Sequence, residues 1–204
     1  MPLTAYLITQ LGTCHGISFA DSTAIKVCHN RRIPSNKVFA EQAKRGKTSV
    51  GWFFGFKLHL ILNDEGEIVW VYVSPGNEDD RKGLRKMLEN PFRAIFGKIF
   101  ADKGYIGKAF FEEMFKDHGV QVVTRLKAKM KCTLPVPSED AFFLRKRCII
   151  ETVIDQLKNI SQIEHSRHRS VTNFLVNLIC GLIAYCHQPK KPSLVSYAEC
   201  LAVA

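Results

Sequence analysis

The chain has 204 residues, of which 46% are hydrophobic and 24% are charged. This composition excludes an intrinsically disordered protein, because 14 Phe, 5 Tyr and 2 Trp side chains favour burial over exposure to water. The length fits one domain. Lys and Arg total 29 against 19 Asp and Glu, which leaves a formal net charge of +10. Such an excess favours a polyanion or an anionic surface as the partner.

The cysteines and the apolar segments indicate a soluble cytoplasmic protein with no membrane partner. The seven cysteines form no Cys-x-x-Cys pair, so we expect reduced thiols rather than a disulfide framework or a zinc site. No Lys or Arg precedes the apolar N-terminal stretch, which disfavours a signal peptide. The longest apolar segment, 174–186, is too short to span a bilayer and contains Asn177 and Gly181.

The first charged side chain of the chain is Asp21. Residues 17–20 before it have a strand pattern, in which Phe19 and Asp21 share one face by period-two alternation. An acid at the end of an apolar strand face is unusual in a structural strand. A carboxylate that caps a turn through the two following hydroxyl residues explains it equally well.

A basic stretch runs from residue 26 to residue 57 and contains Glu41 as its only acid. We interpret it as an exposed loop or arm, and its Arg31 and Arg32 as candidate DNA contacts. Residues 46–48 read Gly-Lys-Thr, like the end of a phosphate-binding loop. That loop needs a glycine five positions earlier, where this chain has Glu41, so nucleotide binding is excluded there.

Alternating elements follow in the middle of the chain. Two β-rich runs, 55–62 and 68–73, are joined by a glycine-containing turn and predict a hairpin. Acidic residues 78–80 precede apolar residues at helical spacing, so we place them at a helix N-terminus, where they favour the helix dipole. A short apolar strand at 99–101 then ends at Asp102.

An amphipathic helix after Gly107 and a strand at 120–124 are predicted next. Beyond this strand, cations alternate with apolar residues, which places four of them on one face of an extended chain. DNA phosphate contact and protection of a sheet edge explain this face equally well. The four cations are Arg125, Lys127, Lys129 and Lys131.

A long helix is predicted from about residue 139 to residue 160, and a last apolar helix at 170–187. In the long helix one narrow stripe borders the apolar face, so Glu151 would lie where the helix meets the sheet. An ordinary salt-bridged helix surface is the alternative, and helix statistics alone favour it. The stripe consists of Arg147, Glu151, Asp155 and Lys158.

The order of these elements and the placing of three acids resemble the DDE transposases of bacterial insertion sequences. The resemblance covers residues 17–187 and implies an α/β, ribonuclease-H-like fold, with a mixed sheet flanked by helices. This chain has Leu144 where the fuller family signature has a tyrosine. The matching motifs are Asp21-Ser22-Thr23, Ala101-Asp102-Lys103-Gly104-Tyr105, and the Arg-x3-Glu-x6-Lys arrangement of Arg147, Glu151 and Lys158.

The resemblance implies that the chain cuts DNA at element ends and joins the 3′-hydroxyl to target DNA by two-metal-ion phosphoryl transfer. Asp21 would bridge two Mg²⁺ or Mn²⁺ ions, while Asp102 and Glu151 would each complete one site. Carboxylate oxygens suit these hard cations better than zinc. Arg147 and Lys158 would contact the DNA, and the enzyme would act as a homodimer on two DNA ends in the bacterial cytoplasm, associated with the nucleoid.

The resemblance also predicts the domain organisation: a short lead-in at 1–16, a catalytic domain at 17–187 and a C-terminal tail at 188–204. Such transposases usually carry an N-terminal DNA-binding region, for which 16 residues are too few. We therefore expect either that the chain is a truncated or re-initiated copy or that another polypeptide segment recognises the DNA binding site. Two alternatives stay open. One is an inactive or repurposed transposase fragment that only binds DNA, and the other is a ribonuclease-H-like nuclease without strand transfer.

Overall fold

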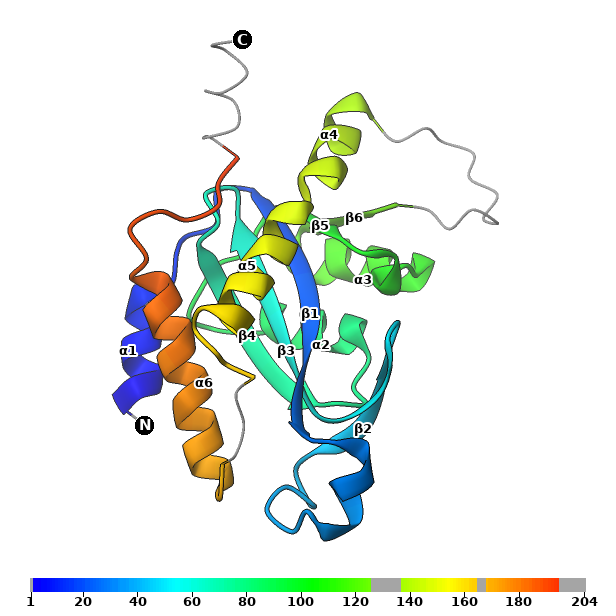
Figure 1. Ribbon diagram of the computed structural model, residues 1–204. Helices are drawn as coiled ribbons and strands as arrows, with labels where there is room; N and C mark the ends of the chain where they lie inside the picture. The colour runs from blue at the N-terminus through cyan, green and yellow to red at the C-terminus, as the bar shows by residue number, and fades with distance from the viewer. Residues whose placement is uncertain (1, 126–136, 165–167, 195–204) are drawn as a thin grey trace.

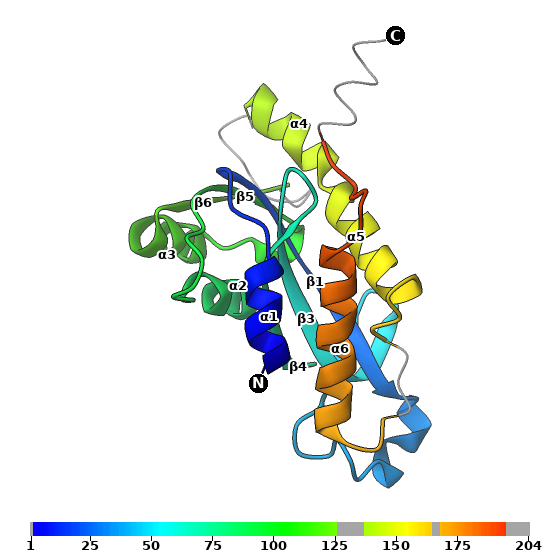
Figure 2. The same cartoon turned by 90° about the vertical axis from the view of Figure 1, so that its left-hand side faces the viewer.

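The computed structural model describes residues 2–125, 137–164 and 168–194. In this part of the chain a six-stranded mixed sheet carries helices on both faces (Figures 1 and 2). The predicted α/β class, a mixed sheet flanked by helices, is therefore confirmed.

Strand β1 (Ile17–Cys28) lies in the middle of the sheet. On one side it pairs in parallel with β5 (Gly97–Ala101), which pairs in parallel with β6 (Val120–Thr124). On the other side it pairs antiparallel with β3 (Gly51–Asn63). The long β1 thus joins an antiparallel half of the sheet to a parallel half.

The outer edge of β3 is shared by two strands. Strand β2 (Lys44–Thr48) pairs with the first part of β3, and β4 (Ile68–Pro75) pairs with the remainder. At Gly55, where β2 gives way to β4, an added Cβ would collide with the backbone oxygen of Ile25 on β1. Glycine is needed there because the two backbones approach too closely for any side chain.

The prediction of a loop or arm over residues 26–57 is wrong for much of that stretch. Strand β1 continues to Cys28, and a short 3₁₀ helix, η1 (Asn30–Ser35), follows. Phe39 and Ala43 are buried in the core and precede β2. The basic composition suggested a loop because basic side chains on an edge strand and a 3₁₀ helix lie on the exposed side. A few buried apolar residues hold the segment against the core.

Helices cover the two faces of the sheet unequally. Figure 2 shows α1 (Pro2–Gln10), α5 (Cys148–Asn159) and α6 (Val171–Cys186) on one face. The opposite face carries α2 (Asp80–Leu88) and α3 (Lys108–His118).

The core has two parts because successive strand residues point to opposite faces. Phe19, for example, packs in the cluster beneath α5 and α6, while its neighbour Ala20 packs in the cluster beneath α2 and α3. Phe56 stacks on Phe174 of α6 with ring centroids 5.0 Å apart. These contacts fix α6 against β3.

Most predicted elements are confirmed. The hairpin is β3–β4, the acidic residues lie at the start of α2 with Asp79 as its N-cap, and the last apolar helix is α6 with Ser170 as its N-cap. The other confirmed elements are the strands β5 and β6 and the helix α3.

The long helix predicted for residues 139–160 is divided into α4 (Ser138–Lys146) and α5. Arg147 lies at the junction with nearly helical backbone angles, φ −54° and ψ −19°. The amide of Ile150 donates to the Arg147 carbonyl at 3.1 Å, which is the three-residue step of a 3₁₀ turn. This tighter turn redirects the chain at Arg147.

The predicted lead-in, residues 1–16, contains a helix that its sequence pattern did not indicate. Leu7 of α1 and the following Leu11 are buried in the core cluster beside α6. The guanidinium of Arg93 donates to the carbonyls of Ile8 and Leu11 at 2.7 and 3.0 Å. Among the helices of the described residues, none is long and apolar enough to cross a membrane.

Candidate active site

The sheet register brings Asp21 and Asp102 together. Ala20 on β1 pairs with Ala101 on the parallel strand β5, so the residues that follow them are neighbours. Asp21 lies inside a continuous strand and accepts a hydrogen bond from the Ser22 amide at 2.8 Å. The alternative explanation of Asp21, a carboxylate that caps a turn, is therefore wrong.

Arg147, at the junction of α4 and α5, contacts all three acids singled out in the sequence. Its guanidinium nitrogens lie 3.1 Å from Asp21 Oδ2, 4.0 Å from Asp102 Oδ1 and 2.7 Å from Glu151 Oε1. The acids thus come from the middle strand, the end of β5 and the first turn of α5. They meet around one positive charge.

These acids differ in their environments. Burial, together with the nearby charges of Asp102 and Asp80, raises the pKa of Asp21 from 3.8 to about 6, against the opposing effects of the Ser22 amide and Arg147. The side chains of Asp102 and Glu151 are each 58% exposed. The site therefore has one buried acid at its base and two acids open to solvent.

The two exposed acids line a cleft of about 340 Å³. Its lining also includes Arg125, which follows β6. The Arg125 guanidinium donates to the Leu144 carbonyl of α4 at 3.4 Å. Two carboxylates, three arginines and a lysine line the cleft, and this mixture of charges suits both cations and phosphates.

The family model described as Transposase DDE domain matches residues 11–171. The chain belongs to this family. The family supports the predicted enzyme class, a transposase of the nucleotidyl transferase or endonuclease kind. No curated protein matches the chain.

Among solved structures, this DDE domain is similar to a chain of the simian T-cell lymphotropic virus intasome in complex with the PP2A regulatory subunit B56 gamma. The TM-score is 0.37 and the sequence identity is 12%. The match covers 88% of the present 204-residue chain and 57% of the viral chain. The DDE domain therefore spans little more than half the length of that chain.

A fourth acid lies beside the site and was assigned in the sequence only to a helix start. Asp80 of α2 accepts a 2.6 Å hydrogen bond from the Ser22 hydroxyl and forms a 2.9 Å ion pair with Lys57. Because Ser22 follows Asp21 on β1, its side chain points to the other face of the sheet. Asp80 thus lies behind the three acids, where its ion pair with Lys57 offsets its charge.

Tyr105, in the Ala-Asp-Lys-Gly-Tyr motif, is fully buried close to these charges. Its hydroxyl has no hydrogen-bond partner among the described residues. Burial holds the pKa of this phenol well above its ordinary value, and Asp21, Asp80 and Asp102 add to the effect.

The donor set suits a hard divalent cation, although no group of three or more His, Cys, Asp or Glu side chains in the described ranges already has a metal-holding arrangement. Three carboxylates supply oxygen ligands, which Mg²⁺ and Mn²⁺ prefer. Arg147 lies between them and provides the positive charge that such a cation would provide. The residues therefore fit the metal ions implied by the family, provided that Arg147 releases the acids.

The predicted DNA contacts lie in different places. Arg125 lines the cleft with the acids, whereas Lys158 is held against β1, with its ammonium 2.9 Å from the Ala24 carbonyl and 3.1 Å from Glu164. Arg31 and Arg32 are exposed on η1, beyond the far end of β1. Lys127 and Lys129 lie outside the described residues.

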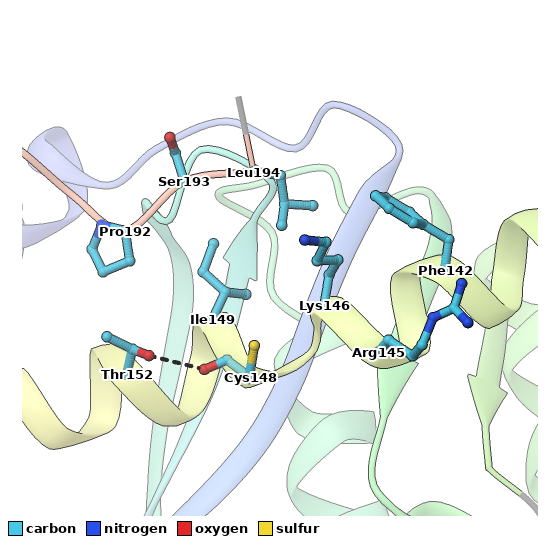
Figure 3. A pocket seen from close by; sticks show the side chains of 9 residues that line it. All are labelled: Phe142, Arg145, Lys146, Cys148, Ile149, Thr152, Pro192, Ser193 and Leu194. Carbon is cyan, nitrogen blue, oxygen red and sulfur yellow. Dashed lines mark hydrogen bonds between the residues drawn. The ribbon is translucent and has the colours of Figure 1, made fainter. Parts of the chain in front are cut away.

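A larger hollow, of about 440 Å³, lies on another side of α4 and α5 (Figure 3). Apolar side chains such as Phe142, Ile149 and Leu194 form much of its wall, and none of the three acids lines it. The candidate site is therefore distinguished by converging charge rather than by volume.

Proposed function

We propose that this DDE domain is part of a bacterial insertion-sequence transposase, which cuts DNA at the element ends and joins the 3′-hydroxyl to target DNA. The observation that carries the proposal is the meeting of Asp21, Asp102 and Glu151 around Arg147. The acids are far apart in sequence, so an ordinary surface salt bridge along one helix does not account for their meeting. Their placing beside a cleft with arginines at its sides suits a phosphodiester substrate.

Asp21, Asp102 and Glu151 would hold two Mg²⁺ or Mn²⁺ ions. When bound, these ions would activate the attacking hydroxyl and stabilise the leaving oxygen. Asp21 must lose its proton to act as a ligand, and its raised pKa means that protons compete with cations at this position near pH 6.

Arg147 has two successive roles in this proposal. Without cations, its guanidinium neutralises the three acids. With cations bound, the guanidinium is free to turn to a phosphate of the scissile strand, where its planar fork can donate two hydrogen bonds. Arg125, which lines the same cleft, would contact the same strand.

The remaining proposals concern the assembly. We expect the active species to be a homodimer on two DNA ends, located in the bacterial cytoplasm with the nucleoid. Residues 17–187 would form the catalytic domain, with 1–16 as a lead-in and 188–204 as a tail. Lys127 and Lys129 would extend the phosphate contacts that begin at Arg125.

The deciding experiment is a cleavage and joining assay on the ends of the element, with the native chain and Asp102→Asn side by side. Asp102 is half exposed, so its substitution leaves the core untouched. The proposal expects nicking and joined products with Mg²⁺ or Mn²⁺, none with chelator, and none from Asp102→Asn. Equal nicking by the two proteins would disprove the assignment, and nicking without joined products would favour a nuclease.

A non-catalytic DNA binder is the second candidate, and one observation favours it. Arg147 already neutralises the acids, so the site is electrostatically satisfied without metal ions. In that case the native chain would bind DNA but would cut no end with any divalent cation. The same assay, accompanied by a binding measurement, separates the two candidates.

A further inference from the structure

The hairpin that joins β2 to β3 presents a large aromatic side chain to solvent. Trp52 is 55% exposed, and Val50 at the turn is 94% exposed. Their neighbours Phe53 and Phe54 are buried and anchor the base of the hairpin. Figure 1 shows β2 and the start of β3 at the side of the sheet, away from the covering helices.

Two cations flank the exposed indole ring. The Arg45 guanidinium lies 5.5 Å from the ring centroid and the Lys47 ammonium lies 5.8 Å from it. Lys47 is the direct cross-strand partner of Trp52, and Arg45 lies two residues before it on the same strand face. Both side chains are exposed, so the hairpin presents a half-exposed indole with two positive charges over its ring.

The backbone around Trp52 is held in place. Its carbonyl accepts a 2.8 Å hydrogen bond from the Asn30 side chain of η1, and the Thr48 hydroxyl donates to the Gly51 carbonyl at 3.1 Å across the turn. The bond to Asn30 also places the exposed Arg31 and Arg32 next to the hairpin. A pre-ordered aromatic platform loses little conformational entropy on binding.

A hollow of about 250 Å³ adjoins this platform, with Trp52 on one side and His29 and Lys26 on its other walls. Lys26 lies five residues after Asp21 on β1, which corresponds to about 17 Å along an extended strand. A few nucleotides span that distance. The hollow is therefore close enough to the acids for one DNA strand to contact both.

We propose that this hairpin is a second DNA contact, at which Trp52 stacks on a base of an unpaired strand while Arg45 and Lys47 bind the adjacent phosphates. The ligand is an unpaired strand, because in duplex DNA the neighbouring base pairs cover the faces of each base. Combining aromatic stacking with flanking cations is the general mode of single-strand binding. The proposal rests on the proposed function only in taking DNA as the ligand.

The test compares three labelled probes: a duplex, the same duplex with an unpaired extension of about ten nucleotides, and the same extension made of abasic sites. The abasic probe keeps the phosphates and removes the bases, so it separates stacking from charge. Binding of the full chain is measured with chelator, which keeps DNA cleavage out of the measurement. Trp52→Ala is compared with Phe115→Ala, which removes another exposed aromatic side chain from α3.

We expect Trp52→Ala to weaken binding of the extended probe by about 5- to 100-fold, the usual effect of losing one stacked base. Binding of the duplex and of the abasic probe should change less than about twofold, and Trp52→Phe should retain most of the native affinity. Equal binding of the extended and abasic probes by the native chain would overturn the proposal. So would an equal loss for all three probes in Trp52→Ala.

Fluorescence provides a readout that does not depend on removing Trp52. The chain has two Trp residues, so Trp70→Phe leaves Trp52 as the only indole. Its emission should be quenched by the extended probe and much less by the abasic one, and equal emission changes would contradict stacking. If the native chain cuts no DNA but these differences appear, the proposed function fails and the second contact stands. If the chain cuts and joins DNA but the differences are absent, the proposed function stands and the second DNA contact fails.

Discussion

The guanidinium of Arg147 lies 3.1 Å from the carboxylate of Asp21, a partner 126 positions away in the sequence. The contact joins the junction of α4 and α5 to the middle strand of the sheet. Both side chains are largely shielded, with exposed fractions of 18% and 22%. An ion pair in such a place affects stability, because removing one partner leaves the other charge poorly solvated.

Arg147→Gln should therefore destabilise the cation-free protein by about 1–3 kcal/mol, the usual cost of an unpaired buried charge. The same substitution should increase the stabilisation by Mg²⁺, since the three acids then lack their internal cation. Thermal unfolding with chelator and with Mg²⁺ measures both effects. Arg31→Gln, which removes an exposed arginine of η1 outside the cleft, is the control and should change neither. A smaller Mg²⁺ effect in Arg147→Gln would contradict the role given to the guanidinium.

Glu151→Gln should abolish cleavage and leave DNA binding within about twofold of the native value. The neutral amide is a poor ligand for a hard cation, and the side chain is exposed enough that folding should not suffer. Asp155→Asn, one turn further along the same exposed side of α5, is the matched control and should cut normally. Persistent metal-dependent nicking by Glu151→Gln would remove this residue from the site.

Lys158 should contact DNA only after it leaves Glu164, its partner at 3.1 Å. Glu164→Gln is therefore expected to tighten DNA binding, because the competing carboxylate is gone. Lys158→Ala should weaken binding and reduce the salt slope by about one unit, as expected for one lost phosphate contact. Binding titrations over a range of salt concentrations measure both changes. An unchanged slope in Lys158→Ala would mean that the lysine serves only to attach α5 to β1.

His59 should make the protein less stable in mild acid. It is fully buried, its Nε2 lies 2.8 Å from the Ser74 hydroxyl, and burial lowers its pKa from 6.5 to about 4, against an opposing effect of Asp80. Above pH 6.5 the imidazole is neutral in both states. As the pH falls, the unfolded chain binds the proton first, so stability is lost between pH 6.5 and 4. The full loss is about 3 kcal/mol.

Denaturant unfolding at several pH values tests this prediction. His59→Gln can keep a hydrogen bond to Ser74 but does not titrate, so its stability should fall less steeply over the same window. Asp21 acts in the opposite direction, because its raised pKa makes the folded state bind more protons between pH 4 and 6. The difference between the two proteins isolates His59, since Asp21 is common to both. Parallel pH profiles would show that the histidine is protonated, or accessible, in the folded state.

The sequence by itself determined the elements with a strong local signal. Short apolar or β-rich runs predicted β5, β6 and the β3–β4 hairpin, and apolar residues at helical spacing predicted α2, α3 and α6. The three acids and Arg147 were also found in the sequence, through motifs whose residue types and spacing are specific. These features depend on neighbouring residues, so they can be derived without knowledge of the fold.

Local sequence patterns did not predict the elements that form through contacts with residues distant in the sequence. The charge-free residues 2–10 form a helix because α6 covers it, and β2 forms because β3 offers an edge to pair with. Asp80 appeared to be only a helix-start residue, since nothing in its surroundings in the sequence indicates Ser22 or Lys57. Likewise, the residues that flank Trp52 become a platform only when the hairpin pairs.

The sequence thus determined which residues carry charge and which segments have apolar residues at strand or helix spacing, because these are properties of the chain itself. Only the tertiary structure decided which charges meet. Asp21 and Asp102 are neighbours because β1 and β5 run in parallel with Ala20 opposite Ala101, and Glu151 joins them because α5 packs over β1. Sheet register and helix packing are set by burial of the two apolar cores, and that burial involves residues from the whole length of the chain.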